Sequence, residues 1–81
     1  SFTLDGRELF TAKIAVGKDS ALVGMTIAML VETHRVMVLS RKCGETPSHL
    51  GPTPAEKIEA CDVLVLHGEL DTLRRLGRLA R

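Results

Sequence analysis

Apolar and polar side chains alternate along residues 8–16, which is the pattern of a β-strand with one buried face. Thr11, Lys13 and Ala15 would point away from the core. A run of turn-forming residues begins at Gly17 and ends the strand. The side chains predicted to face the core are Phe10, Ala12, Ile14 and Val16.

The apolar spacing changes to that of a helix after residue 20. A single apolar stripe predicts a helix of about three turns that begins near Gly24 and Thr26. Residues 36–39 then form an unbroken apolar run, which predicts a strand in the middle of a sheet or covered on both sides. The helical stripe consists of Val23, Ile27, Leu30, Val31 and His34.

The second half of the chain opens with a turn at residues 43–45. Residues 46–54 contain all three prolines and predict an irregular or edge connection with room for a short strand. Residues 62–67 form another dense strand, after which Gly68 would release the chain into a last helix. That helix has acidic residues in its first turn and arginines toward its end, an order that complements the helix dipole. Its apolar positions are Leu70, Leu73, Leu76 and Leu79.

These elements predict one α+β domain, a small mixed sheet of three to four strands packed with two helices. At 81 residues the chain has room for one core only. The domain would occupy residues 7–81, and residues 1–6 would be a tail or linker. The chain does not begin with Met, which leaves open that it is a fragment of a longer protein.

The composition narrows the classes of function. Apolar residues make up 44% of the chain, yet Phe2 and Phe10 are the only aromatic ones, which argues against base stacking or an aromatic cage. The net charge of +1 gives no electrostatic reason to expect nucleic acid or an anionic membrane as the main partner. No apolar run approaches the roughly 20 residues of a membrane span, and the start does not resemble a signal peptide. A cytoplasmic protein is expected.

The polar residues show no catalytic or metal-binding pattern. Glu32 and His34 are two residues apart and would not share a helix face, so we expect no enzyme. The histidines and cysteines lack the close spacing of a zinc site, so no metal site is expected, although a stand-alone metal-binding domain is a weaker alternative. Cys43 and Cys61 are too few for a disulfide framework, which favours reduced thiols. The C-terminal arginines, Arg74, Arg75, Arg78 and Arg81, fit a solvated basic face.

Four segments, in order and at their spacing, resemble the C-terminal (TrkA-C) domain of the RCK regulators of potassium transport. Residues 20–27 resemble S-x-L-x-G-x-T-L, and residues 36–45 resemble VxVLAxRRxGE. Residues 54–68 resemble P-x-x-x-x-L-x-x-G-D-V-L-V-V-x-G, and residues 69–76 resemble the closing x-x-x-L-x-x-L helix. The resemblance covers about residues 7–77.

Several matched residues have a physical role of their own. Gly24 would allow the tight turn into the first helix, and Gly68 the change from strand to helix. Asp62 would bond the backbone and hold the turn before its strand. Cys61 stands where the family usually has Gly, so this turn would be of a type that needs no positive φ.

The resemblance implies a cytoplasmic, ligand-sensing regulatory domain of a potassium (monovalent cation) channel or transporter, lying at the inner membrane through its parent protein. Its expected partners are a second copy of the chain, a membrane channel or transporter subunit and an upstream nucleotide-binding RCK lobe, but no nucleic acid. No cofactor is expected. Some relatives bind cyclic di-adenosine monophosphate through a longer segment at their dimer interface, and in this chain the shorter residues 31–35 stand in its place. The signal would be this dinucleotide or another small ligand. A ligand-free dimerisation scaffold is the alternative.

The ligand site implied by the resemblance is centred on residues 31–36, one wall of a small pocket at a two-fold dimer interface. The apolar floor would come from the preceding strand. His34 also has a purely structural interpretation, as a charge-favoured residue at a helix C-terminus. The candidate site residues are Ile14, Val16, Val31, Glu32, Thr33, His34, Arg35 and Val36.

Overall fold

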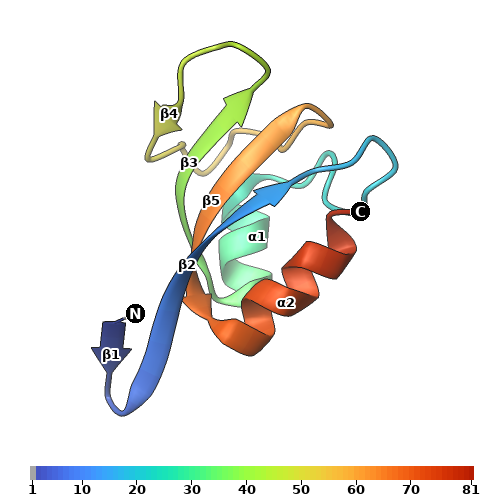
Figure 1. Cartoon of the computed structure of the whole chain (residues 1–81). Helices are drawn as coiled ribbons and strands as arrows, with labels where there is room; N and C mark the ends of the chain where they lie inside the picture. The colour runs from blue at the N-terminus through green and yellow to red at the C-terminus, as the bar shows by residue number, and fades with distance from the viewer. Residues whose placement is uncertain (1) are drawn as a thin grey trace.

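A computed structural model of the chain describes residues 2–81, and within them the elements alternate between strands and two short helices (Figure 1). The α+β class is therefore confirmed. The elements, in chain order, are β1 (Phe2–Leu4), β2 (Arg7–Ala15), α1 (Ile27–His34), β3 (Met37–Cys43), β4 (His49–Leu50), β5 (Asp62–Glu69) and α2 (Leu70–Leu79).

The described strands form one five-stranded sheet in the order β1-β2-β5-β3-β4, and every neighbouring pair is antiparallel. The predicted sheet was mixed and had three to four strands. Strand β5 lies between β2 and β3, so the two strands joined through α1 run in the same direction without pairing. The additional strands are short edge strands: β1 lies in the expected tail at residues 1–6, and β4 lies in the proline-rich segment.

Both helices cover the same face of the sheet, where a single core lies (Figure 1). Helix α2 packs on β2 and β5, and α1 packs on β3. Strand β5 alternates strictly, with Asp62, Leu64, Leu66 and Gly68 buried and the residues between them half-buried. The largest fully buried apolar side chains are Leu22, Leu30, Ile58, Leu64, Leu66 and Leu76.

Strand β3 lies inside the sheet, between β5 and β4, which is one of the two predicted alternatives. It departs from the other expectation, that its apolar run is covered on both faces. Val36, just before the strand, is buried, whereas Met37 and Leu39 are 60% and 36% exposed. The expectation was wrong because the described part of the chain places both helices on one face of the sheet, leaving the other face open. A run of apolar residues cannot distinguish a two-sided strand from a one-sided strand with exposed apolar side chains.

Helix α1 is shorter than predicted because its cap lies at Thr26. The Thr26 hydroxyl accepts a hydrogen bond from the Met29 backbone N–H at 3.1 Å, which satisfies one of the free donors of the first turn. Val23 therefore lies outside the helix and is exposed. Gly24 has φ +89° in the turn before the cap, so its predicted conformational role is confirmed.

Gly68 was predicted to end its strand and begin the last helix. This prediction was wrong, because Gly68 lies inside β5. A Cβ atom at this position would meet Val36 Cγ1 at 3.2 Å, so a side chain here would require Val36 to shift. The turn before β5 does follow the prediction: the Asp62 carboxylate accepts from the Glu59 N–H at 2.8 Å. Cys61 does not adopt a positive φ, which occurs only at Asp5 and Arg35 among the described non-glycine residues.

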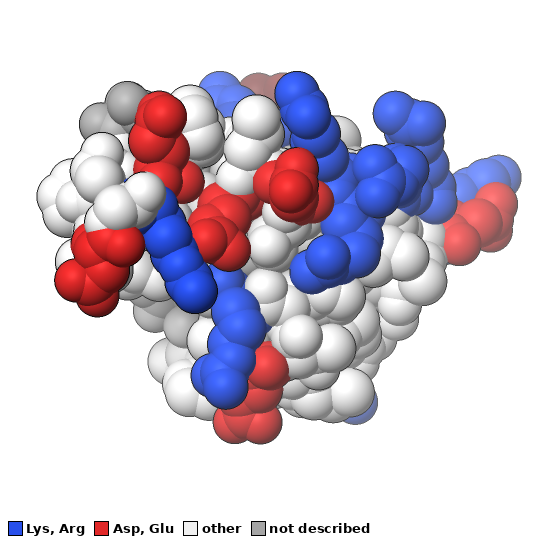
Figure 2. Space-filling view, turned by 90° about the horizontal axis from the view of Figure 1, so that it is seen from below, with Lys and Arg blue, Asp and Glu red and all other residues white. Residues whose placement is uncertain are grey.

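The C-terminal helix exposes its charged side, as predicted. Leu73, Leu76 and Ala80 are buried, whereas the four arginines at positions 74, 75, 78 and 81 are exposed. In the view from below, basic side chains gather beside acidic ones (Figure 2). Neither described helix has the length and apolar character that crossing a membrane requires.

Candidate ligand-binding site

Residues 31–36, called here the 31–36 segment, form the end of α1 and the entry into β3. The helix ends because Arg35 adopts the left-handed conformation, with φ 59° and ψ 52°, and its N–H donates to the Val31 carbonyl at 2.9 Å. This bend turns the chain sharply from the helix layer to the sheet. Two grooves open on either side of the segment.

The first groove, of about 390 Å³, lies between the 31–36 segment and the β1–β2 hairpin. Its walls are largely apolar but include Arg7, Arg35 and His67. Arg7 Nε lies 3.5 Å from Glu69 Oε1, an exposed ion pair at the rim. The groove therefore combines an apolar surface with cationic groups. It is lined by Leu4, Arg7, Leu9, Val31, Arg35, Val36, Met37, His67, Gly68 and Glu69.

His67 is held in place on the open face of the sheet. Its Nδ1 lies 2.9 Å from Thr11 Oγ1 on the neighbouring strand, in the register that pairs these residues. The Phe2 ring packs against it, with 6.4 Å between the ring centroids. The β1–β2 hairpin thus fixes the orientation of one polar group of the first groove.

The second groove, of about 380 Å³, lies between α1 and the proline-rich segment. Its surface is mainly apolar, and the charged side chain it contains is that of Glu32. The walls from α1 and from residues 52–54 are joined by backbone hydrogen bonds: the Ala28 N–H donates to the Pro54 carbonyl at 3.0 Å. The groove is lined by Ile27, Ala28, Val31, Glu32, Val36, Met37, Val38, Pro52 and Pro54.

The structure brings together half of the predicted site residues. Val31 and Val36 line both grooves, Arg35 lines the first and Glu32 the second. Thr33 and His34 lie beside them in the chain but line neither. The role of the 31–36 segment in ligand binding stays a prediction.

Ile14 and Val16, predicted as the apolar floor, lie away from both grooves. They are buried in the core at the far end of β2, where Ile14 pairs with Leu64 and the Val16 N–H donates to the Asp62 carbonyl. The 31–36 segment lies near the other end of β5, beside Gly68. Sequence alternation reveals which face a residue occupies but not which end of the sheet it reaches.

Sequence reasoning missed the walls that oppose the 31–36 segment. Leu4, Arg7 and Leu9 come from a hairpin whose first strand lay in the expected tail. Pro52 and Pro54 come from a segment predicted as an irregular or edge connection, with no part in the site. The prolines were the one available signal, since they mark an edge of the structure that a neighbouring chain or ligand can approach.

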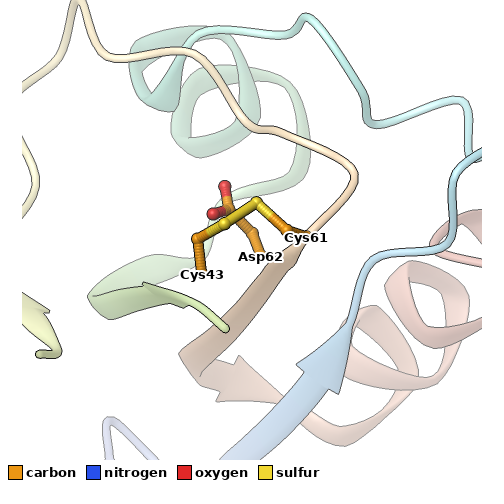
Figure 3. Close-up of side chains that lie close together, drawn as sticks. All are labelled: Cys43, Cys61 and Asp62. Carbon is orange, nitrogen blue, oxygen red and sulfur yellow. A yellow bond between two sulfur atoms is a disulfide. The ribbon is translucent and has the colours of Figure 1, made fainter. Parts of the chain in front are cut away.

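A group of possible metal ligands lies at the opposite end of the sheet, where Cys43, Cys61 and Asp62 come together (Figure 3). The two cysteines form a disulfide, with 4.8 Å between their Cα atoms, so the expectation of reduced thiols is contradicted. Spacing in the chain does not reveal this pair because β3 and β5 align Cys43 with Asp62 only after folding. With the sulfur atoms bonded to each other, neither is a thiolate ligand.

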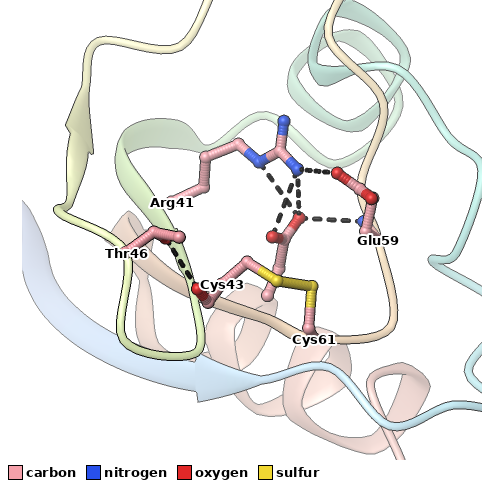
Figure 4. The surroundings of a disulfide bond; sticks show 6 residues. Arg41, Cys43, Thr46, Glu59 and Cys61 are labelled. Atoms are coloured by element: carbon pink, nitrogen blue, oxygen red, sulfur yellow. Dashed lines mark hydrogen bonds and ion pairs between the residues drawn. A yellow bond between two sulfur atoms is a disulfide. The ribbon is translucent and has the colours of Figure 1, made fainter.

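The Asp62 carboxylate is fully occupied by hydrogen-bond donors (Figure 4). Its side chain has no exposed surface, and the guanidinium of Arg41, a side chain only 14% exposed, lies against it. Arg41 also donates to Glu59 at 2.8 Å and to Glu56 at 3.2 Å. Burial disfavours the charge on Arg41, but the hydrogen bonds to Asp62 and Glu59 outweigh it and raise the pKa of the guanidinium. The arrangement joins β3, β5 and the 53–62 segment.

The antiparallel sheet, the α1 crossover and the single helix layer form a fold that an RCK_C domain of known structure shares. The RCK_C domain dimer of S. agalactiae BusR in complex with c-di-AMP matches with a TM-score of 0.71 and 22% identity, over 85% of this chain and 92% of that chain. S. agalactiae BusR in complex with its busAB-promotor DNA matches with a TM-score of 0.71 and 21% identity, over 85% of this chain. The sequence matches no protein-family model and no curated protein.

The comparison corrects one expectation about partners. We expected no nucleic acid, on the ground of the near-neutral net charge. The BusR chain with the same fold is bound to promoter DNA, and this chain spans only 34% of its length. The net charge of one domain does not exclude nucleic acid as a partner of the protein that contains it, because other domains can supply the basic surface.

Proposed function

We propose that this chain is a dimerising regulatory domain that binds a small ligand beside the 31–36 segment and has no catalytic activity of its own. The observation that carries the proposal is the position of this segment between two grooves, in a fold that the RCK_C domain of BusR shares and in which that domain is dimeric and bound to c-di-AMP. Ligand binding would stabilise one dimer geometry and so bias an attached effector.

The chemistry of the two grooves favours an anionic ligand with a flat apolar part. The first groove provides Arg7, Arg35 and His67, which suit phosphate oxygens. The second provides an apolar surface of aliphatic side chains and two prolines. Cyclic di-adenosine monophosphate has both kinds of group. Both grooves are lined by Val31, Val36 and Met37. The phosphate and adenine groups of the dinucleotide would meet at these residues.

We propose that the regulated process is the transport of potassium or another monovalent cation, at the cytoplasmic side of the inner membrane. The support is the ordered sequence resemblance to the RCK transport regulators together with the shared fold. BusR, which contains a domain with this fold, is in complex with promoter DNA. We therefore propose that the domain attached to the ligand-binding domain decides whether the ligand regulates transport or transcription.

The test measures ligand binding and oligomeric state on the same samples. Addition of cyclic di-adenosine monophosphate is expected to raise the Tm and to favour the dimer in sedimentation. Arg35→Gln, which removes a cation from the first groove, should reduce the Tm shift, and Ala28→Leu should do so by filling the second. Thr33→Ala is the matched control, since Thr33 is exposed and lines neither groove.

Two outcomes would overturn the proposal. A chain that remains monomeric at high micromolar concentration with and without the dinucleotide is not a dimerising sensor. A dimer that gains no stability from cyclic dinucleotides, adenine nucleotides or monovalent ions is the ligand-free scaffold, the alternative function for this fold.

A further inference from the structure

A third groove, of about 460 Å³, lies away from the 31–36 segment, on the face of the sheet that the helices leave open. The strand register places Lys13 and Ser40 on either side of Val65, and Lys42 beside Val63. One end of the groove is formed by Cys61 and by the turn at Gly44. The lining therefore combines two lysines, two serines and Cys61, one of the two residues of the Cys43–Cys61 disulfide.

We propose that this groove is a thiol–disulfide exchange site, in which an anionic low-molecular-weight thiol attacks the Cys43–Cys61 disulfide at Cys61. Cys61 is exposed and lines the groove, whereas Cys43 is half-buried and does not. Access decides which sulfur of a disulfide is attacked. Lys13 and Lys42 would attract a thiol that carries carboxylates, and Glu59 is already paired with Arg41.

The reaction is balanced by two molecules of the thiol. The first thiolate attacks Cys61 Sγ, forms a mixed disulfide there and releases Cys43 as a thiolate, which takes a proton from water. A second thiolate then attacks the small-molecule sulfur of the mixed disulfide. This step releases Cys61, which is protonated in turn, and yields the oxidised disulfide of the small thiol. The protein disulfide is reduced by two electrons, and two small thiols are oxidised.

The residues between the two cysteines connect this chemistry to the second groove. They include Pro52 and Pro54, which line that groove. Backbone carbonyls of the same segment accept hydrogen bonds from the first residues of α1. The Ile27 N–H donates to the Glu56 carbonyl at 2.8 Å, and the Ala28 N–H to the Pro54 carbonyl. Opening the disulfide removes the covalent closure of this segment, while the Arg41–Asp62 pair still joins β3 to β5. Reduction should loosen the groove wall without unfolding the sheet.

The effect on ligand binding rests on the proposed function, whereas the exchange reaction does not. A cytoplasmic location, as proposed above, strengthens the case, because disulfides that form in the cytosol are usually transient and redox-sensing. The domain would then respond to a second signal: the redox state of small thiols would set how firmly the wall of the second groove is held.

The exchange site is tested with single-cysteine variants of the chain. In Cys43→Ser, Cys61 remains and should form a mixed disulfide with oxidised glutathione about 10-fold faster than Cys43 does in Cys61→Ser, as measured by mass spectrometry. In Cys43→Ser the rate should fall in the order glutathione disulfide, neutral hydroxyethyl disulfide, cationic cystamine. Replacing both lysines, Lys13→Gln with Lys42→Gln, should remove this order. Equal rates at both cysteines, or no dependence on reagent charge, would overturn the assignment.

The coupling is tested by hydrogen exchange on the unmodified chain with its disulfide intact and after reduction by glutathione. The Ile27 and Ala28 amides should exchange faster after reduction, whereas amides in the centre of β5 should stay protected. Unchanged protection at Ile27 and Ala28 would overturn the coupling but leave the exchange site. Since neither measurement uses a regulatory ligand, failure of the proposed sensor function would appear separately, as the absence of a dinucleotide-dependent Tm shift.

Discussion

Arg41 and Asp62 form a bidentate ion pair: Arg41 Nε donates to Asp62 Oδ2 at 3.0 Å, and Arg41 Nη2 donates to Oδ1 at 3.2 Å. The two residues lie on adjacent strands, two residues out of direct register, since Cys43 is the direct partner of Asp62. A carboxylate without exposed surface requires such a partner, because an unpaired buried charge is costly. The pair therefore secures the end of the sheet where the disulfide and the 53–62 segment meet.

Removal of the Asp62 charge should be among the most destabilising polar changes in the chain. We expect Asp62→Asn to lower the free energy of unfolding by about 3 kcal/mol, since it leaves Arg41 largely buried beside a neutral amide. Urea denaturation measures the loss. Glu59→Gln is the control: Glu59 also contacts Arg41 but is 64% exposed, so its replacement should cost less than about 1 kcal/mol. Similar losses of stability for both variants would contradict the central role of the Arg41–Asp62 ion pair.

Glu56 should make the stability depend on acid pH. The hydrogen bond from the Thr53 N–H, at 2.6 Å, is the largest cause that lowers the pKa of Glu56 below its ordinary 4.5, and Arg41 and His49 add to it. Because its pKa is lower in the folded chain, the ionised Glu56 carboxylate stabilises the fold above about pH 4.5. This contribution to stability is lost as the pH falls through the lowered pKa. Denaturation of Glu56→Gln from about pH 7 to pH 3 should show a shallower acid loss than the parent chain. An unchanged slope would contradict the assignment.

Gly68 should not tolerate a side chain. Gly68→Ala places a Cβ atom 3.2 Å from Val36 Cγ1 in the core, and we expect a loss of about 1–3 kcal/mol. The matched control is Gly77→Ala in α2, where a Cβ atom meets nothing within 4 Å and should stabilise the helix by up to about 1 kcal/mol. Thermal unfolding separates the two. Adding Val36→Ala to Gly68→Ala should cost less than the two single losses combined, because the crowding is relieved.

Arg35 should be replaceable by glycine without loss of the fold. Its φ of 59° is unfavourable for any residue with a Cβ atom, so Arg35→Gly should raise the free energy of unfolding by up to about 1 kcal/mol. Arg35→Ala keeps the unfavourable backbone and should give no gain. If Arg35→Gly stabilises the chain but abolishes the Tm shift caused by the dinucleotide, the Arg35 side chain serves ligand binding and not the fold. A destabilised Arg35→Gly chain would instead show that the side chain supports the fold.

The sequence pattern was informative wherever one residue type repeats with a fixed period. The alternation along β2 and the leucine spacing of α2 indicated which faces are buried, and those side chains lie in the core or pack against it, except Leu70, which is exposed. The Thr26 and Gly24 signals marked the start of α1. The pattern failed where an element is too short to have a period, as in β1 and β4, and where one face of β3 stays open despite its apolar residues.

The chain by itself determined the α+β class and the principal helices and strands, because these depend on local periodicity and on ordered motifs. The 31–36 segment as a ligand site stays a prediction. Only the tertiary structure decided what this segment faces, that Ile14 and Val16 belong to the core, and that Cys43 and Cys61 meet. The physical reason is the insertion of β5 between β2 and β3. This pairing joins residues that are about 19 (Cys43 and Asp62) to 60 (Leu9 and Glu69) positions apart, and no local pattern contains their register.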